Sequence, residues 1–337
     1  MAIDIFSIKP NVITRDLSGK SFLFFGERKS GKTTNACKFP KPILLAFEKG
    51  YGMIPGVIAQ PINAWKEALA VKKQLLKDAE QAKEEGRETH FKSVIVDTID
   101  IAYDLCEKYI VDKEGVEFLD ETEKMRGYRE LSREYDRFFQ EIVKAGYTLV
   151  CISHATTKQI KENGEKFDKT IPTVPDRGFL VVARLVDVCA YASYETDPET
   201  GVTSSWLTMR GSKYLEAGSR NPYMSEKIPF TYEALRDDMA QAIDKLEANG
   251  GTVINEENNL FKDQSEPAPD LNTLVNEIKK YAKVMNANDI MNDYSKIVAE
   301  YLGKGRNVKD CDESQTDMLV LILDDLKDYF AEHNLSI

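Results

Sequence analysis

The residues with the clearest chemical potential form one short run, Gly26-Glu27-Arg28-Lys29-Ser30-Gly31-Lys32-Thr33. This run fills every fixed position of G-x-x-x-x-G-K-[ST], a pattern typical of a loop that binds phosphate groups. Its two glycines allow a tight turn and a close approach of backbone to phosphate, with backbone N–H groups facing the anion. Lys32 is placed to reach the β- and γ-phosphates, and the Thr33 hydroxyl to bind Mg²⁺. We therefore expect ATP and Mg²⁺ as ligands.

The residues on either side match the context that this loop needs. Residues 21–25 form an apolar run that predicts a buried strand, and residues 34–38 can continue as the first turns of a helix. The alternative, a glycine turn beside an ordinary lysine, does not explain this strand–loop–helix order. Together with Asp97, considered next, the predicted nucleotide-binding residues are Gly26, Lys29, Ser30, Gly31, Lys32, Thr33, Thr34 and Asp97.

Three further apolar runs are each followed by a polar side chain: Glu48 after residues 42–47, Asp97 after residues 93–96, and His154 after residues 147–153. Asp97 would hold Mg²⁺ through water or orient Thr33, although a carboxylate at a strand end is also a common helix cap. In a mostly parallel sheet the carboxyl ends of the strands meet at one edge, where ligands bind. We therefore predict one active site that these residues share with the glycine loop.

The order of the elements indicates the fold class. Strands and helices alternate through residue 153, which predicts an α/β fold with a mostly parallel sheet flanked by helices. A hairpin or mobile loop is expected over residues 158–174, and a strand pair over residues 186–194 and 202–209. The expected helices of this part cover residues 63–85, 99–111, 125–145 and 232–248.

Composition changes near residue 249. The next stretch is rich in glycine, asparagine and acidic residues and holds Pro267 and Pro269, which is typical of a linker. Beyond it the pattern is helical, over residues 271–285, 287–302 and 314–332. The predicted division is an α/β core over residues 1–248, a linker over residues 249–270 and a small C-terminal all-α bundle over residues 271–337.

The net charge of −11 comes from the last third of the chain. From Glu233 onward there are 22 acidic and 11 basic residues, whereas the preceding residues hold 34 of each sign. The chain therefore has no overall basic character that would indicate nucleic-acid binding.

Several classes of protein are disfavoured. No apolar run approaches the ~18–20 residues of a membrane span, and the N-terminus lacks the basic and apolar regions of a signal peptide. The five cysteines are scattered without a C-x-x-C pair, so a metal site built on thiolates is not expected. We expect a protein without membrane contact, working in a reducing cytoplasm.

With these residues in view, the chain resembles the RecA-like ATPases. It is most similar to the phage-encoded nucleotide-binding proteins that act as small RecA-like single-strand annealing recombinases. The phosphate loop indicates only a superfamily. The run Phe47-Glu48-Lys49-Gly50 narrows the resemblance to these phage-encoded proteins. The resemblance covers roughly residues 10–230 and rests on residues 26–34, 39–50, 94–97 and 150–154. It implies an ATPase that binds single-stranded DNA, assembles as a homo-oligomeric ring or filament, and works in a phage-infected bacterial cell.

The resemblance also implies roles for individual residues. Glu48 matches the glutamate that activates the attacking water, and a carboxylate beside the γ-phosphate can accept a proton. His154 takes the place of the polar residue that senses the γ-phosphate, where RecA has glutamine. With Lys32 these two are the predicted catalytic residues. A basic residue from a neighbouring subunit would complete the site, and the candidates are Arg210, Lys213 and Arg220.

The resemblance also implies contact with DNA in the loops after residue 154, over about residues 155–177. A positively charged groove with an aromatic ring on which bases can stack is the usual arrangement for single strands. The candidate residues are Lys158, Lys161, Lys166, Phe167, Lys169 and Arg177. The same segment carries Glu162, Glu165, Asp168 and Asp176, so a solvated hairpin is the alternative.

Two other functions stay open. A nucleotide-switched binding module would hydrolyse ATP slowly and recruit a replication or recombination partner, such as a single-strand-binding protein, through the C-terminal helices. A phosphate-loop kinase would need several arginines near the phosphates. Arg126, Arg129, Arg133 and Arg137 are spaced along one predicted helix, but Glu48 fits the ATPase better.

Overall fold

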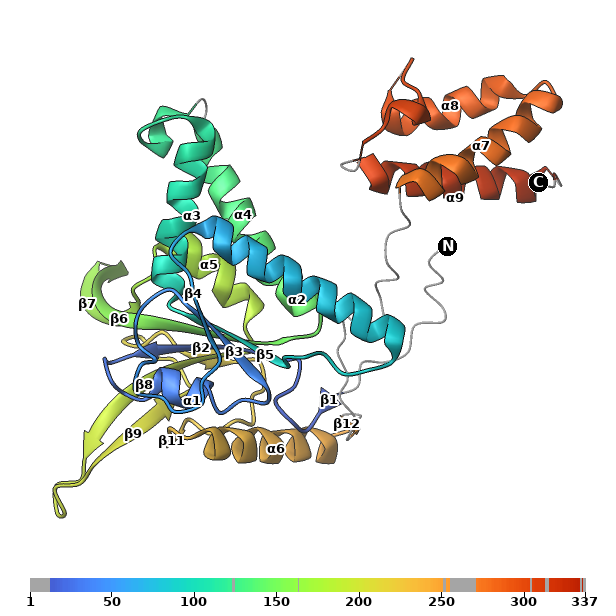
Figure 1. Cartoon of the computed structure of the whole chain (residues 1–337). Helices are drawn as coiled ribbons and strands as arrows, with labels where there is room; N and C mark the ends of the chain where they lie inside the picture. The colour runs from blue at the N-terminus through green and yellow to red at the C-terminus, as the bar shows by residue number, and fades with distance from the viewer. Residues whose placement is uncertain are drawn as a thin grey trace. The chain divides into compact units, whose positions relative to one another are not determined.

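The computed structural model describes residues 13–122, 125–162, 164–250, 253–254, 271–303, 305–312, 315–333 and 335. They belong to two compact units, with the described residues up to 254 in one and those from 271 onward in the other (Figure 1). Each unit has its own hydrophobic core.

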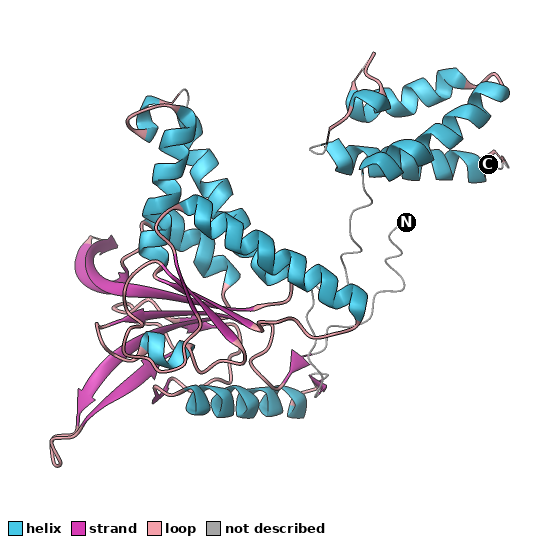
Figure 2. Cartoon of the chain, in the orientation of Figure 1, coloured by secondary structure: helices cyan, strands magenta, loops and turns pink. Residues whose placement is uncertain are grey.

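The larger unit is built on a mixed, mostly parallel sheet (Figure 2). Its central strands run in the order β8-β2-β6-β5-β3-β4, and each neighbouring pair is parallel. These strands are β2 (Ser21–Gly26), β3 (Pro42–Ala46), β4 (Ala59–Pro61), β5 (Ser93–Asp97), β6 (Thr148–Glu162) and β8 (Val188–Thr196). The antiparallel additions are β7 (Glu165–Pro172), β9 (Thr203–Thr208), β10 (Gly218–Ser219) and β11 (Lys227–Pro229).

Helices cover both faces of this sheet (Figure 1). Alternate strand residues point to opposite faces, so Leu23 and Val96 join one core while Phe24 and Ile95 join the other. The first core is shared with α2 (Trp65–Glu85), α3 (Ile99–Glu114), α4 (Arg126–Lys144) and α5 (Asp176–Leu185). The second is shared with α1 (Lys32–Ala36) and α6 (Tyr232–Ala248). The predicted α/β class with a parallel sheet flanked by helices is confirmed.

One strand differs from the prediction in a way that matters for the site. The sequence pattern ends a strand at residue 153, but β6 continues without a break to Glu162. It can do so because its outer half pairs with β7 in a continuous antiparallel register from Ala155–Pro172 to Glu162–Glu165, which satisfies its backbone groups. Asn163, within the predicted hairpin over residues 158–174, lies outside the described residues.

The smaller unit contains α7 (Leu271–Ala287), α8 (Met291–Leu302) and α9 (Thr316–Glu332). Buried residues from the three helices, including Leu274, Val298 and Ile322, form its core. Helix α8 begins four residues later than the pattern predicts, because the chain turns after α7 through Asp289 at φ +59°. Among the described residues, no helix is both long and apolar enough to cross a membrane.

Most of the predicted linker, residues 249–270, lies outside the described residues. Within it, β12 (Val253–Ile254) pairs in parallel with β1 (Ile13–Thr14). Two 3₁₀ turns complete the described elements, η1 (Leu119–Glu121) and η3 (Val308–Asp310).

Candidate functional site

The glycine loop begins where β2 leaves the sheet between β6 and β8. Gly26 lies opposite His154 on one side and Ala192 on the other. A Cβ atom on Gly26 would lie 2.0 Å from the Ala192 carbonyl oxygen, and its φ of +146° suits glycine alone. At the other end of the loop Gly31, with φ +87°, is the N-cap of the short helix α1. Both fixed glycines are therefore required by the backbone path.

Lys32 lies inside this loop and is only 7% exposed. Its Nζ donates to the carbonyl oxygens of Gly26 at 3.0 Å and Glu27 at 2.7 Å. Burial lowers the pKa of Lys32, and the nearby carboxylates of Asp97 and Glu48 oppose that shift. The ammonium group is thus held by the loop at its first residues.

Thr33 and Asp97 form a polar pair beside the loop. The Thr33 hydroxyl donates to Asp97 Oδ2 at 2.7 Å, and Asp97 is 2% exposed. Burial raises the pKa of Asp97 to about 6, while the bond from Thr33 lowers it. Gly50 lies alongside, since a Cβ there would be 3.6 Å from Asp97 Oδ2 and 3.7 Å from Thr33 Oγ1. A hydroxyl and a carboxylate at this place are hard oxygen ligands that fit Mg²⁺.

Glu48 and His154 contact each other, which the sequence did not predict. His154 Nε2 lies 3.4 Å from Glu48 Oε2, and both side chains are about one-third exposed. The contact lowers the pKa of Glu48 and raises the pKa of His154. Glu48 is positioned through its backbone, because its N–H and that of Phe47 both donate to the Asp97 carbonyl. The structure therefore brings the four predicted strand ends to one edge of the sheet.

Other predicted nucleotide-binding residues have different environments. Ser30 is fully buried and its hydroxyl donates to the Glu27 carbonyl at 2.8 Å, which holds the loop closed. Lys29 lies at φ +63° with an exposed side chain. The side chain of Thr34 in α1 is also exposed.

Two residues of this region were given no role of their own by the sequence reasoning. Gly50 follows Glu48 by two positions, and its missing side chain leaves room beside the Thr33–Asp97 pair. Asp100 lies in the first turn of α3 and accepts hydrogen bonds from Ser153 and Thr173. A second carboxylate three residues after Asp97 was the available signal.

The three basic residues predicted to reach the active site of a neighbouring subunit have different surroundings. Arg210 is exposed just beyond β9. Lys213 contacts the β6–β7 hairpin, with its Nζ 3.0 Å from Glu165 Oε2 and 4.6 Å from the centre of the Phe167 ring. Arg220 pairs with Asp187 at 3.1 Å, next to the amino-terminal ends of β2 and β8. These surroundings do not single out one of the three residues, so the role of each stays a prediction.

The candidate DNA-binding residues divide between the two faces of the hairpin. Residues directly opposite in an antiparallel pair share a face. Lys158 and Lys169 oppose each other on the face of Phe167, and both form ion pairs, Lys158 with Asp176 and Lys169 with Glu216. Lys161 and Lys166 oppose each other on the other face, are exposed, and form no ion pair with the described residues. Arg177, on α5, stacks over the Tyr128 ring at 4.4 Å.

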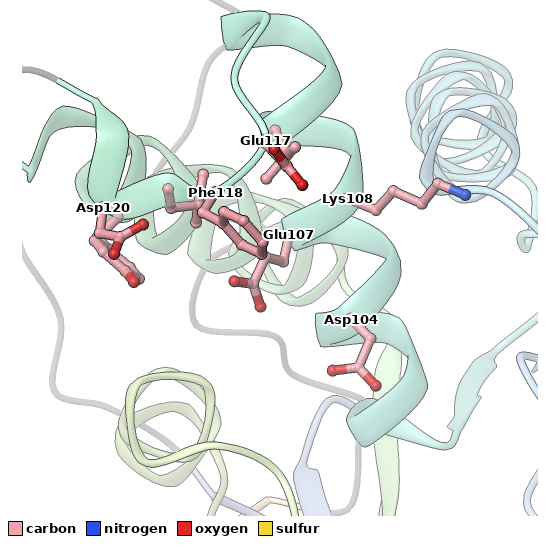
Figure 3. Close-up of a pocket in the computed structure, with 9 residues that line it drawn as sticks. Asp104, Glu107, Lys108, Glu117, Phe118 and Asp120 are labelled. Atoms are coloured by element: carbon pink, nitrogen blue, oxygen red, sulfur yellow. The ribbon is translucent and has the colours of Figure 1, made fainter.

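A separate pocket of about 570 Å³ lies between α3, η1 and α4 (Figure 3). Carboxylates dominate its polar lining, and the ring of Phe118 is exposed beside it. The labelled lining residues are Asp104, Glu107, Lys108, Glu117, Phe118 and Asp120. A lining of this charge is unfavourable for phosphate groups.

The loop, its lysine and the Thr33–Asp97 pair place the chain in the class of P-loop NTPases. Residues 18–221 match the AAA domain family, and the chain belongs to this family. The SPbeta prophage-derived uncharacterized protein YorG of Bacillus subtilis (strain 168) is 31% identical over 338 residues, covering 98% of this chain and 100% of that protein. Among solved structures, the KaiC-like protein PH0186 from Pyrococcus horikoshii OT3 aligns over 63% of this chain and 85% of its own, with 11% identity and a TM-score of 0.32.

Proposed function

We propose that the protein is a Mg²⁺-requiring, RecA-like ATPase that assembles on single-stranded DNA and promotes annealing or recombination. The observation that carries this proposal is the Glu48–His154 contact at 3.4 Å beside the phosphate loop, on the strand that continues into the hairpin. This contact links Glu48, which is suited to activating water, to strand β6, whose outer half is suited to contacting DNA.

The hydrolysis step follows from the side chains at the sheet edge. Thr33 and Asp97 would hold Mg²⁺, which when bound neutralises charge on the β- and γ-phosphates. Lys32 would add positive charge at the γ-phosphate. Glu48, whose pKa is lowered by His154, is ionised near neutral pH and can accept the proton of the attacking water. His154 would orient this carboxylate and respond to the γ-phosphate.

The hairpin supports the DNA part of the proposal. Like charges directly opposite each other destabilise a strand pair. Lys161 and Lys166 form such a pair and are exposed, so a phosphate backbone lying across that face would relieve the repulsion. Phe167 lies on the other face against the Tyr214 ring, with centroids 6.0 Å apart. This contact makes the ring a packing residue of the hairpin, and the two lysines are the stronger candidates for DNA contact.

Assembly and origin are further parts of the proposal. A base from a neighbouring subunit, chosen among Arg210, Lys213 and Arg220, would complete the site in a homo-oligomer. Similarity to a prophage-derived protein of Bacillus subtilis along the whole chain supports a phage-encoded protein that acts in the cytoplasm of its host.

A second candidate is a nucleotide-switched binding module. The C-terminal helices have their own core, and Met318 and Leu321 on α9 are 41% and 50% exposed. These features support a surface through which a replication or recombination partner, such as a single-strand-binding protein, would be recruited.

The test is ATP hydrolysis with and without single-stranded DNA, by the wild type and by Lys32→Ala. The proposal expects hydrolysis that DNA stimulates and that the substitution reduces by about 100-fold or more. Hydrolysis that requires Lys32 but ignores DNA would favour the binding module. Hydrolysis that persists in Lys32→Ala would contradict both functions.

A further inference from the structure

At the base of the β6–β7 hairpin, one carboxylate oxygen accepts hydrogen bonds from both sides. Strand β6 leaves the sheet at Ser153 and His154, and the chain returns from β7 at Thr173, whose N–H donates to the His154 carbonyl at 3.0 Å. The hydroxyls of Ser153 and Thr173 both donate to Asp100 Oδ1, the first at 2.9 Å. Asp100 therefore ties the outgoing and the returning strand to helix α3.

Asp100 is also connected to the nucleotide site in two ways. It follows Asp97, the partner of Thr33, by three residues. Ser153 directly precedes His154, whose ring reaches Glu48. A change in the position of Asp97 or His154 would thus move one of the groups that hold the hairpin.

Unsatisfied polar atoms gather at the same place. Among the described residues, the buried side-chain atoms without a hydrogen-bond partner are Thr98 Oγ1, Asp100 Oδ2 and His154 Nδ1. Buried polar atoms are nearly always paired, so a group of them beside a binding site calls for an explanation. A spare acceptor on Asp100 and a spare ring nitrogen on His154 allow a second hydrogen-bonding arrangement at the hairpin base.

We propose that Asp100 is a positioning residue that couples the nucleotide site to the hairpin through Ser153 and Thr173. This inference rests on the proposed nucleotide function. It assigns the coupling between the nucleotide site and the hairpin to the carboxylate of Asp100. Asp100 needs no contact with the nucleotide, because it acts through the strand that carries His154 and through the return of β7.

The experiment is amide hydrogen exchange of residues 155–172 in the full chain. It compares Mg²⁺ plus a non-hydrolysable ATP analogue with Mg²⁺ plus ADP. Thr173→Val removes the hydroxyl with little change of shape, and Thr173→Ser is the matched control because it keeps the hydroxyl. Asp100→Asn, which keeps the shape and removes the charge, is the second variant. Isothermal titration gives the nucleotide Kd of every protein.

We expect exchange in the hairpin to differ between the two nucleotides in the wild type and in Thr173→Ser. In Thr173→Val and Asp100→Asn that difference should fall by roughly tenfold, as expected for loss of a bond to a charged group, while the Kd changes less than about twofold. A full difference retained in Thr173→Val would overturn the inference, as would a wild-type hairpin that responds equally to both nucleotides. A hairpin that responds while DNA fails to stimulate hydrolysis would sink the proposed DNA-coupled function and leave the coupling intact. Absence of nucleotide binding in the wild type would overturn both.

Discussion

The two halves of strand β6 share one backbone but differ in almost every physical property. The inner half, up to Ser153, is buried between β2 and β5, and its end meets the Lys32 loop and Glu48. The outer half pairs with β7 alone, and its charged side chains are exposed. At the inner end, side chains such as Thr33 and Glu48 have specific partners, whereas along the outer half the charges are spread over two faces. Substitutions should therefore have sharp effects at the inner end and graded effects along the hairpin.

The largest effect is expected from Glu48→Gln. Removing the carboxylate that accepts the proton of water should reduce ATP hydrolysis by about 10²–10⁴-fold, while the nucleotide still binds. Steady-state hydrolysis and a nucleotide titration measure the two effects. Glu84→Gln, an exposed glutamate on α2, is the matched control and should behave as the wild type. A Glu48→Gln protein that hydrolyses ATP normally would remove this residue from the mechanism.

Gly26→Ala should be the most damaging glycine substitution for stability. Its φ and the Ala192 carbonyl 2.0 Å from the added Cβ predict a loss of roughly 3 kcal/mol or more in the free energy of unfolding. Gly164→Ala is the comparison at the hairpin tip, where φ is +88° and nothing lies within 4 Å, so about 1 kcal/mol is expected. Urea unfolding of both variants measures the contrast. Equal losses would show that the end of β2, where the glycine loop begins, is no more tightly constrained than the hairpin.

A graded effect is expected when Lys161 and Lys166 are both changed to alanine. Each lost phosphate contact should reduce the slope of log affinity against log salt by roughly 0.7 for a single strand, and affinity should fall correspondingly. Lys158→Ala is the control, because that lysine already pairs with Asp176 at 2.6 Å. Fluorescence anisotropy with an oligonucleotide at several salt concentrations gives both quantities. A larger loss of affinity in Lys158→Ala than in the double variant would show that DNA contacts the face of Lys158 and not the face of Lys161 and Lys166.

The smallest effect is the pH dependence of the Glu48–His154 contact. The pKa of His154 is raised above 6.5, so its stabilisation is complete below pH 6.5 and is lost as pH rises through the raised value. The pKa of Glu48 is lowered below 4.5, so its stabilisation is present above pH 4.5 and is lost as pH falls through the lowered value. The contact should therefore stabilise the fold most between about pH 4.5 and 6.5, by about 1 kcal/mol or less at this exposure.

Chemical denaturation of the wild type and His154→Gln at pH 5.5 and pH 8.5 measures this term. The difference between the two proteins should be larger at pH 5.5. NMR titration of the chain's three histidines checks the direction for His154 independently. A His154 signal that titrates below pH 6.5 would contradict the contact with an ionised Glu48.

Much of the nucleotide site could be predicted from the sequence because its geometry is local. The glycine loop, Lys32 and Thr33 are neighbours along the chain, and their spacing alone places them around a phosphate. Glu48, Asp97 and His154 are distant in sequence, yet each follows an apolar run. In a parallel sheet that is enough to bring such ends to one edge.

Only the tertiary structure decided the contacts that depend on register and on long-range packing. The continuity of β6 into the hairpin is one, because it required β7 as a partner for residues 155–162. The Glu48–His154 contact and the bonds of Asp100 to Ser153 and Thr173 also depend on which strands are neighbours. Short-range patterns determine which elements form and which residues stand at their ends. The side chains that finally meet depend on the strand order and register, because these set the few ångströms within which a hydrogen bond can form.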